Sequence, residues 1–381
     1  MKLTVPIRSW HLLMLSLFFL PGTSFIVKAQ GPIPQNFPRH DWQPTRAQPG
    51  WRYLGNQVCS TCHVAEAATQ PSTPMGVALE LASDCQILLS HPSLRVTLGG
   101  YTYKITSVSG HATYVVSGRH GAISAELVYA LGHGDAGQTY LFRYKGAYYE
   151  SQVSYFNQIQ GLDMTLGHSP VPTANLEAAL GVRLSEEDAV RCFACHSTAA
   201  VRNRALQLDR MMPGLTCEGC HGPGAEHVAA VKAGRLADLH IFNPGRLRDG
   251  DLNDFCGSCH RTASDVAALN VAGAKTVRFQ SYRLFLSRCF LMSNESLSCV
   301  TCHNPHQPLE PNEAFYDSKC LACHSLTKNS ASRAHQDAVR CPVGRRNCAT
   351  CHMPKVALPG GHYKFADHDI RIVRPGEPFP G

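Results

Sequence analysis

Apolar and polar residues alternate along a central part of the chain. The alternation is clear in Leu94-Arg-Val-Thr-Leu98 and Tyr101-Thr-Tyr-Lys-Ile105, on either side of Gly99-Gly100. The stretches that carry this pattern are 94–98, 101–105, 114–117, 125–131, 138–144 and 147–156. A period of two places successive side chains on opposite faces of a strand. Residues 94–160 are therefore predicted to form a β-module of about five or six antiparallel strands joined by Gly-rich turns.

The remainder of the chain has the pattern of short helices and loops. Residues 185–188, Ser-Glu-Glu-Asp, resemble a helix start with a capping serine and acids in the first turn. Residues 225–233 predict a short helix that the following glycine ends. Pro and Gly are scattered through 30–56, 242–250 and 354–381, which favours extended surface segments there.

The N-terminus has the pattern of a secretory signal. Lys2 and Arg8 form a positive region, residues 10–20 are apolar, and Val-Lys-Ala at 27–29 offers a cleavage site. The apolar run is shorter than the about 20 residues that a transmembrane helix needs. We expect residues 1–29 to be a signal peptide and the chain to be exported to the periplasm. An uncleaved anchor is the alternative.

Seven copies of Cys-x-x-Cys-His use fourteen of the seventeen cysteines. Their cysteines are Cys59, Cys62, Cys192, Cys195, Cys217, Cys220, Cys256, Cys259, Cys299, Cys302, Cys320, Cys323, Cys348 and Cys351. The histidines that close them are His63, His196, His221, His260, His303, His324 and His352. In a c-type haem the two thiols bond to the porphyrin and the histidine binds the iron. Chance would place about 0.04 such motifs in this chain.

Zinc and disulfides are the alternatives to haem. The pairs Cys299/Cys302 and Cys320/Cys323 have the spacing of a zinc ribbon. A ribbon, however, does not require a histidine directly after every second cysteine, and neither does a disulfide framework. The sequence therefore predicts seven covalently bound c-type haems.

The haems change the meaning of the net charge. The chain carries +7, and removal of Lys2, Arg8 and Lys28 with the signal leaves 7 − 3 = +4. Fourteen haem propionates would bring the total to 4 − 14 = −10. Many Arg and Lys are therefore predicted to be propionate partners, and a nucleic-acid role has no support. With 352/7 ≈ 50 residues per haem after cleavage, we expect porphyrin to replace much of an apolar core.

The motifs divide the chain unevenly, because 133 residues separate Cys59 from Cys192. We predict four regions: a signal peptide (1–29), an N-terminal segment with the first motif (30–93), a haem-free β-module (94–160) and a multihaem domain with six motifs (161–381). The predicted fold class is mainly short α-helices and loops wrapped around stacked c-type haems, with an inserted antiparallel β-module.

Three elements carry a family resemblance: Gly-Leu-Thr-Cys-Glu-Gly-Cys-His-Gly-Pro-Gly-Ala-Glu-His at 214–227, Ser-Cys-Val-Thr-Cys-His-Asn-Pro-His at 298–306, and Cys-Ala-Thr-Cys-His-Met-Pro at 348–354. They resemble the multihaem cytochrome c superfamily, which includes relatives of octahaem hydroxylamine oxidoreductase and pentahaem nitrite reductase. The chain looks like an exported bacterial heptahaem member. The resemblance implies that His227 and His306 are distal iron ligands.

Other histidines are candidates from their local positions. The further candidates for distal ligands are His335, His368, His362, His91 and His168. His362 and His368 are too close together to serve one iron easily. Met75 is an alternative axial ligand, although a core methionine is the simpler interpretation. His111, His120 and His133 are predicted to be solvated in turns of the β-module.

Three cysteines lie outside the motifs: Cys85, Cys289 and Cys341. In an exported protein, one disulfide and one spare thiol are the ordinary expectation. A thiolate ligand to iron is the alternative.

Two functions fit these features. The first is electron transfer between redox partners, such as other cytochromes or a membrane quinol oxidoreductase, with the β-module supporting docking or shielding the first haem. The alternative is a reductase or oxidase of a small nitrogen or sulfur oxyanion, which needs one open haem; its catalytic residues are unknown. All seven motifs end in His, unlike the Lys-containing catalytic motif of the nitrite reductases that the chain resembles. A binding module is a third interpretation.

Overall fold

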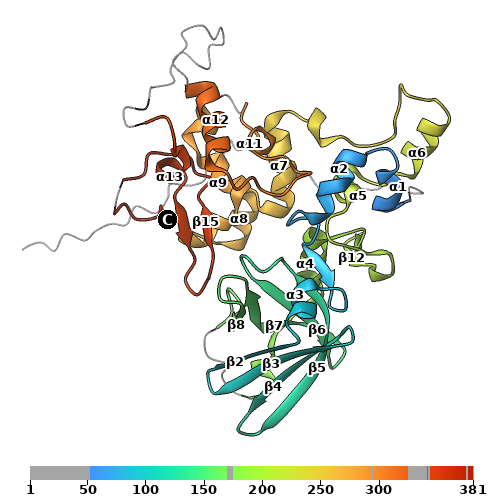
Figure 1. Cartoon of the computed structure of the whole chain (residues 1–381), viewed down its shortest axis with the longest axis vertical. Helices are drawn as coiled ribbons and strands as arrows, with labels where there is room; N and C mark the ends of the chain where they lie inside the picture. Colours follow the sequence, from blue (N-terminus) through green and yellow to red (C-terminus); the bar gives the residue numbers. More distant parts are fainter. Residues whose placement is uncertain are drawn as a thin grey trace, which may run out of the picture. The chain divides into compact units, whose positions relative to one another are not determined.

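The computed structural model describes residues 52–169, 175–293, 296–324, 341, 344–374 and 376–380 (Figure 1). All of them belong to one compact unit, Phe37–Gly381. The predicted signal peptide lies outside the described residues. None of the helices in the described ranges has the length and apolar character that crossing a bilayer requires.

The β-module is a nine-stranded antiparallel sheet. Its sequential path is β2 (Ser93–Leu98), β3 (Tyr101–Val108), β4 (His111–Gly118), β5 (Gly121–Leu131), β6 (Gln138–Tyr144), β7 (Ala147–Phe156) and β8 (Gly161–Met164). Two short strands join it from outside this path: β1 (Leu79–Leu81) pairs with β5, and β9 (Gly181–Arg183) pairs with β7. The six predicted strands are present. Strands β1, β8 and β9 were not predicted, because three or four residues are too few to show alternation.

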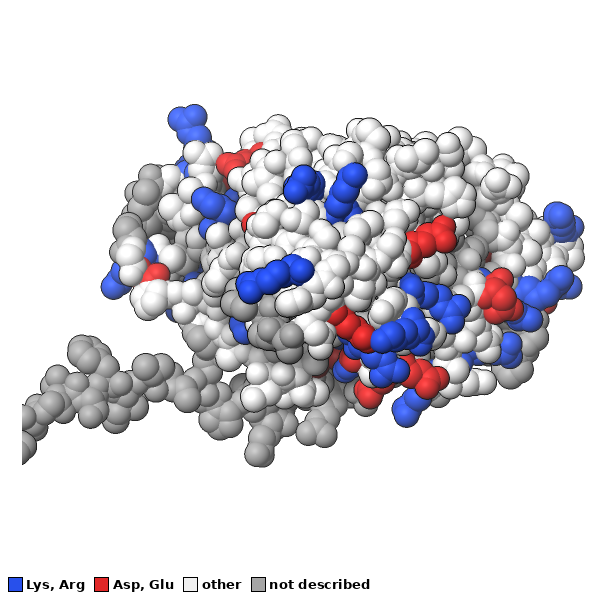
Figure 2. All heavy atoms as spheres, turned by 90° about the horizontal axis from the view of Figure 1, so that it is seen from below, with Lys and Arg blue, Asp and Glu red and all other residues white. Residues whose placement is uncertain are grey.

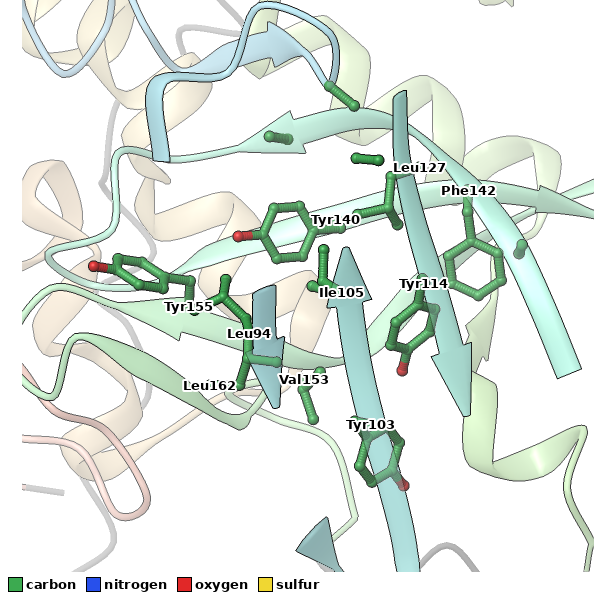
Figure 3. Packing of buried hydrophobic residues seen from close by; sticks show 14 of the residues in the cluster. Leu94, Tyr103, Ile105, Tyr114, Leu127, Tyr140, Phe142, Val153, Tyr155 and Leu162 are labelled. Carbon is green, nitrogen blue, oxygen red and sulfur yellow. The ribbon is translucent and has the colours of Figure 1, made fainter. Parts of the chain in front are cut away.

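The sheet curls into a nearly closed barrel, since β2 and β8 at the two ends of its path come back beside each other. Large aromatic side chains fill the inside (Figure 3). Those exposed by 1% or less are Tyr103, Tyr114, Tyr140, Phe142 and Tyr155. The Tyr114 hydroxyl donates to the Leu180 carbonyl at 3.1 Å, which attaches the segment before β9 to the core. The β-module therefore has an apolar core of its own.

The histidines His111 and His120 of the β-module differ in their backbone position: one lies in a strand and the other in a turn. His111 begins strand β4 instead of lying in a turn, and its side chain is 78% exposed beside Glu126. It is solvated, as predicted, although its backbone is extended. His120 lies in the turn between β4 and β5.

The helices are short. They are α1 (Asn56–Ser60), α2 (Val64–Thr69), α3 (Gln86–Ser90), α4 (Glu186–His196), α5 (Cys217–His221), α6 (Ala225–Lys232), α7 (Asp249–His260), α8 (Ala263–Leu269), α9 (Gln280–Leu286), α10 (Arg288–Met292), α11 (Cys299–Cys302), α12 (Glu313–His324) and α13 (Cys348–His352). Three small hairpins accompany them: β10 (Ser197–Thr198) with β13 (Met212–Pro213), β11 (Val201–Arg202) with β12 (Ala205–Leu206), and β14 (Lys355–Ala357) with β15 (Lys364–Ala366).

Local sequence signals explain where two helices begin and end. Ser185 caps α4, and its hydroxyl accepts the Asp188 N–H at 3.0 Å, as predicted. Helix α6 ends before Gly234, whose φ of 72° is the left-handed conformation that glycine tolerates. Apolar clusters among these helices are small: Ala263, Val266 and Tyr282 form one, and Leu284, Phe285 and Phe290 form another.

The barrel core makes a testable prediction. Ile105 is fully buried in β3, whereas Val108, in the same strand, is 66% exposed. Ile105→Ala should lower the free energy of unfolding of the β-module by about 2–5 kcal/mol, because it leaves a cavity. Val108→Ala should change it by no more than about 0.5 kcal/mol. Urea unfolding followed by far-ultraviolet circular dichroism measures both, and equal losses would contradict this packing.

Candidate haem-binding sites

All seven Cys-x-x-Cys-His motifs lie on helical turns. The second, fourth and sixth motifs end helices α4, α7 and α12, whereas the third and seventh are the whole of α5 and α13. The first motif begins in α1. The cysteines of the fifth motif begin and end α11, and its histidine follows directly. In both motifs the histidine N–H donates to the carbonyl of the first cysteine, at 3.0 Å. Residues i, i+3 and i+4 share one face of a helix. Each motif therefore presents two thiols and an imidazole together, as covalent haem attachment requires.

Three of these imidazoles face a second histidine from a distant part of the chain. The ring centroids are 6.4 Å apart for His63 and His227, 6.1 Å for His221 and His306, and 6.3 Å for His303 and His368. An ion bound about 2 Å from one nitrogen of each ring would place the two centroids about 6 Å apart. The spacing fits an iron between the rings in all three pairs. The structure thus brings together three predicted distal ligands with three proximal ones.

Hydrogen bonds orient the rings for binding through Nε2. In five histidines the Nδ1–H donates to a backbone carbonyl, which fixes the tautomer and leaves the Nε2 lone pair available. These bonds are His196 to Ala78 (2.9 Å), His221 to Phe242 (3.0 Å), His227 to Leu239 (2.9 Å), His352 to Arg371 (3.0 Å) and His368 to Ala366 (3.0 Å). Proximal and predicted distal histidines are held in the same way.

Burial favours the neutral form, which is the form that binds a metal ion, in several of these histidines. Desolvation is the largest cause that lowers the pKa of His196, His221, His260 and His303. It lowers the pKa of His368 to about 4, with the neighbouring His303 as the next cause. The His368 side chain nevertheless keeps part of its surface accessible. A ring enclosed by protein but open on one side is what a haem site requires.

A buried ion cluster holds His368 in place. Arg283, from α9, donates from Nε and Nη2 to the two carboxylate oxygens of Asp367, at 2.8 and 2.9 Å, and its Nη2 reaches Asp369 at 3.2 Å. Arg371 donates to Asp367 at 2.6 Å, and its carbonyl accepts the Nδ1–H of His352. Arg283 is 1% exposed and Asp367 is fully buried. The cluster thereby fixes one predicted distal ligand and one proximal ligand.

The electrostatics of the cluster favour the charged carboxylate of Asp367. Burial raises the pKa of Asp367, but hydrogen bonds and charge attraction from Arg283, with Arg371, outweigh burial and lower it. The Arg283 guanidinium also lies 4.6 Å from the centre of the Phe379 ring. Sequence reasoning missed this cluster; its local signal was the Asp-His-Asp of residues 367–369.

Three other predicted ligands direct their Nε2 atoms to β-module side chains. His91 Nε2 lies 3.2 Å from the Tyr155 hydroxyl, His168 Nε2 lies 3.0 Å from Glu150, and His362 Nε2 lies 2.8 Å from Asp163. The Nδ1 atoms of His91 and His168 are also hydrogen-bonded. The arrangement is that of histidines that stabilise the module, and their role as iron ligands stays a prediction. His335 lies outside the described residues.

The cysteines outside the motifs do not form the expected disulfide. Cys85 is fully buried in the β-module, its thiol donates to Gln138 at 3.1 Å, and burial raises its pKa to about 11. Cys289 is unpaired and lies close to Cys323 and Cys302. Since neither is in a disulfide, that expectation was wrong. Within the described ranges, no group of three or more Cys, His, Asp or Glu side chains is arranged to hold a metal ion.

Comparisons with known proteins agree with the motifs. A family model described as "Cytochrome c554 and c-prime" matches residues 165–222, which contain the second and third motifs. The multiheme cytochrome MtrA of Shewanella baltica (strain OS185) is 24% identical over 210 residues, which cover 51% of this chain and 54% of that protein. The chain thus spans about half the length of this curated relative. The matches and the seven motifs make this chain similar to multihaem c-type cytochromes.

A solved structure also resembles the chain. The outer cell wall cytochrome OcwA aligns with a TM-score of 0.49 and 14% sequence identity, over 85% of this chain and 80% of that one.

The histidine pairs make the second prediction. His227→Ala, His306→Ala and His368→Ala should each convert one low-spin haem into a high-spin haem, because each removes one axial nitrogen. His111→Ala, at an exposed position, is the control and should leave the spectrum unchanged. Resonance Raman spectra of the oxidised holoprotein count the high-spin haems. Parental spectra in all three variants would overturn these ligand assignments.

The ion cluster makes the third prediction. Arg283→Met should lower the free energy of unfolding by about 3–5 kcal/mol, because it removes three charged hydrogen bonds to the carboxylates of Asp367 and Asp369 and leaves Arg371 as their remaining cation. It should also raise the high-spin signal by up to one haem, since Arg283 no longer fixes Asp367 and Asp369, the two residues that flank His368.

Arg248→Met is the matched control, because Arg248 is 80% exposed and pairs with Asp251 at the surface. It should cost less than about 1 kcal/mol and leave the haem spectrum unchanged. Denaturant titration and resonance Raman spectra measure the two effects separately. A parental spectrum of Arg283→Met would contradict a positioning role for the cluster.

Proposed function

We propose that the chain is an exported, periplasmic heptahaem c-type cytochrome that transfers electrons between redox partners. The observation that carries this proposal is that three pairs of histidine rings from distant parts of the chain lie with their centroids 6.1–6.4 Å apart, a spacing that fits one iron between the two rings. An iron with two protein ligands has no open position for a substrate, and such a haem is suited to gain and lose electrons. Haem supplies the redox chemistry, and the residues of this chain fix its ligands, orientation and surroundings.

The helices that carry the motifs form one connected set. Helices α1 and α5 are in contact, and so are α4 and α7, α7 and α11, α11 and α12, and α12 and α13. The third and fourth motifs connect through Phe242, whose carbonyl holds His221, and Phe255, which precedes Cys256; their rings are 5.8 Å apart. Taken by motif number, the order is 1–3–4–5–6–7, with motif 2 branching from motif 4. Haems in this order would give electrons a continuous path.

The β-module supports the haem of the second motif in this proposal, not that of the first. Phe193, inside the second motif, packs edge-on against Tyr129 of β5 at 5.1 Å and lies 6.1 Å from Tyr148 of β7. The His196 ring donates to the Ala78 carbonyl, directly before β1. These contacts attach the second motif, which branches from the fourth in the order above, to the sheet. We infer that the module shields that haem or forms part of a docking surface for a partner.

The charges on the face seen in Figure 2 suit a protein partner better than a nucleic acid. Lys and Arg side chains are interspersed with Asp and Glu there, and much of that face is uncharged. Nucleic-acid binding calls for clustered positive charge.

A specific observation also favours the alternative function, an oxyanion reductase or oxidase. Arg261 and Arg278 lie close enough to His196 to lower its pKa further after burial, and among the described residues no second imidazole is stacked on His196. An open haem beside two guanidinium groups would attract a small anion. The same arginines would equally suit the propionates of that haem.

The fourth prediction separates the two functions. Holoprotein whose mass shows seven covalent haems should be reduced rapidly by a low-potential donor and reoxidised by a second carrier, with no turnover of nitrite or hydroxylamine. Steady turnover of either at about 1–10 per second would be typical of an enzyme and would favour the alternative. Arg278→Met identifies the site in that event, because it should abolish turnover if the anion binds beside His196. Fewer than six haems would overturn the heptahaem proposal.

A further inference from the structure

Three polar residues occupy the same position in three different motifs. Asn56, Asn253 and Asp317 each lie three residues before the first cysteine of their own motif, the first, fourth and sixth. The side-chain oxygen of each accepts the backbone N–H of the first cysteine of another motif. The bonds are Asn56 to Cys217 (2.9 Å), Asn253 to Cys299 (2.9 Å) and Asp317 to Cys348 (2.8 Å), and Asp317 also accepts the Asn347 N–H at 2.7 Å.

The accepted N–H groups lie at the beginning of very short helices. Cys217, Cys299 and Cys348 are the first residues of α5, α11 and α13, which have only four or five residues each. The first N–H groups of a helix have no partner inside it, so another group has to satisfy them. Here the partner comes from a different motif, 31 to 161 residues away. Each bond therefore fixes one motif relative to another, besides capping a helix.

The same three junctions bring the first cysteines together. Cys59 lies beside Cys217, Cys256 beside Cys299 and Cys320 beside Cys348, near enough for the two side chains of each pair to interact. The first cysteine of such a motif bonds to the same side of the porphyrin in each haem. Two haems joined through their first cysteines would consequently meet at equivalent edges. The junction sets how closely those edges approach.

The other motifs lack this feature, which shows that it is not general to the haem attachment sequence. The equivalent positions in the second, third, fifth and seventh motifs hold Ala189, Gly214, Ser296 and Arg345. The second motif meets the fourth through its second cysteine instead: Cys195 lies beside Cys259, and its Sγ is 3.8 Å from the Ser258 carbonyl oxygen. In the motifs that receive a junction, glycine and arginine hold this position in the third and seventh, and the Ser296 hydroxyl of the fifth bonds to the Ser293 carbonyl and not to another motif.

We propose that Asn56, Asn253 and Asp317 are positioning residues that clamp the haems into three pairs, those of motifs 1 and 3, 4 and 5, and 6 and 7. The clamp acts through the backbone of the receiving motif and holds the two haem edges at a fixed separation. This inference rests on the proposed function only for the identity of the bound group. Beyond that function, the inference names the residues that set the separation of neighbouring haems, and it depends on no particular redox partner or substrate.

Electron paramagnetic resonance of the oxidised holoprotein tests the clamps, because two closely spaced ferric haems broaden each other's signals by spin coupling. Leucine has nearly the size of asparagine and aspartate but accepts no hydrogen bond. Asn253→Leu and Asp317→Leu should each weaken the coupling within one pair, which should narrow the signals of those two haems relative to the parental spectrum while their coupling to haems outside the pair remains. Asn253→Asp and Asp317→Asn keep the oxygen that accepts the cysteine N–H. Each loses one other bond, from the Asn253 amide to the Leu297 carbonyl or from the Asn347 N–H to Asp317, so each should preserve more of the parental coupling than the matching leucine variant.

Ser296→Ala is the control, because it changes the same position in a receiving motif, where the Ser296 hydroxyl bonds only to the nearby Ser293 carbonyl. It should leave all signals as they are. Parental coupling in both leucine variants, or equal disruption by the leucine and acceptor-retaining variants, would overturn the proposal. Where a leucine variant does not accumulate, Asn56→Leu and Asn56→Asp provide the same comparison at a partly exposed site. Turnover of nitrite would refute electron transfer as the function and leave this result intact.

Discussion

An iron held by two imidazole nitrogens, one on each face of its porphyrin, would connect two distant segments of chain, and the haem-bearing part of this chain contains three histidine pairs that fit such a site. In the three pairs that the structure brings together, the second histidine comes from the segment of a later motif. His227 follows the third motif, His306 follows the fifth, and His368 follows the seventh. One haem would thus join two motif segments, and three such haems would join motifs 1, 3, 5 and 7 into a continuous body. Small apolar clusters among the helices suffice because the cofactor is the main connection.

The β-module, unlike the haem-bearing helices, is stabilised by an apolar core of its own side chains. Its strands are mostly sequence neighbours, so local turns bring them together, and tyrosine and phenylalanine side chains fill the barrel. Histidines that the sequence offered as ligands are used here as hydrogen-bonding groups, as His168 is between Glu150 and Gln152. The group that faces Nε2 therefore separates candidate iron ligands from histidines that bond to other side chains. The position of a histidine along the chain does not separate them.

Local sequence patterns predicted the features that depend on residues close together in the chain. Alternation located the six longer strands, the Ser185 cap located α4, and the Cys-x-x-Cys-His spacing located the motifs. The resemblance to multihaem cytochromes suggested His227 and His306, and local position suggested His368. The Arg283 cluster and the Asn56, Asn253 and Asp317 bonds escaped, because their partners are 31 to 161 residues away. The repeated polar residue three positions before Cys59, Cys256 and Cys320 was visible, but only its partners give it meaning.

The ion cluster around His368 also bears on redox chemistry. A buried negative charge next to an iron ligand favours the ferric state, since reduction adds an electron to the same region. Asp367 and Asp369 flank His368, yet Arg283 and Arg371 are paired with both of them. With all four groups ionised the cluster sums to zero. The chain thus gains rigid placement of a ligand through strong charged hydrogen bonds while adding no net charge beside the iron. The potential of that haem is then left to burial and to its neighbouring haems.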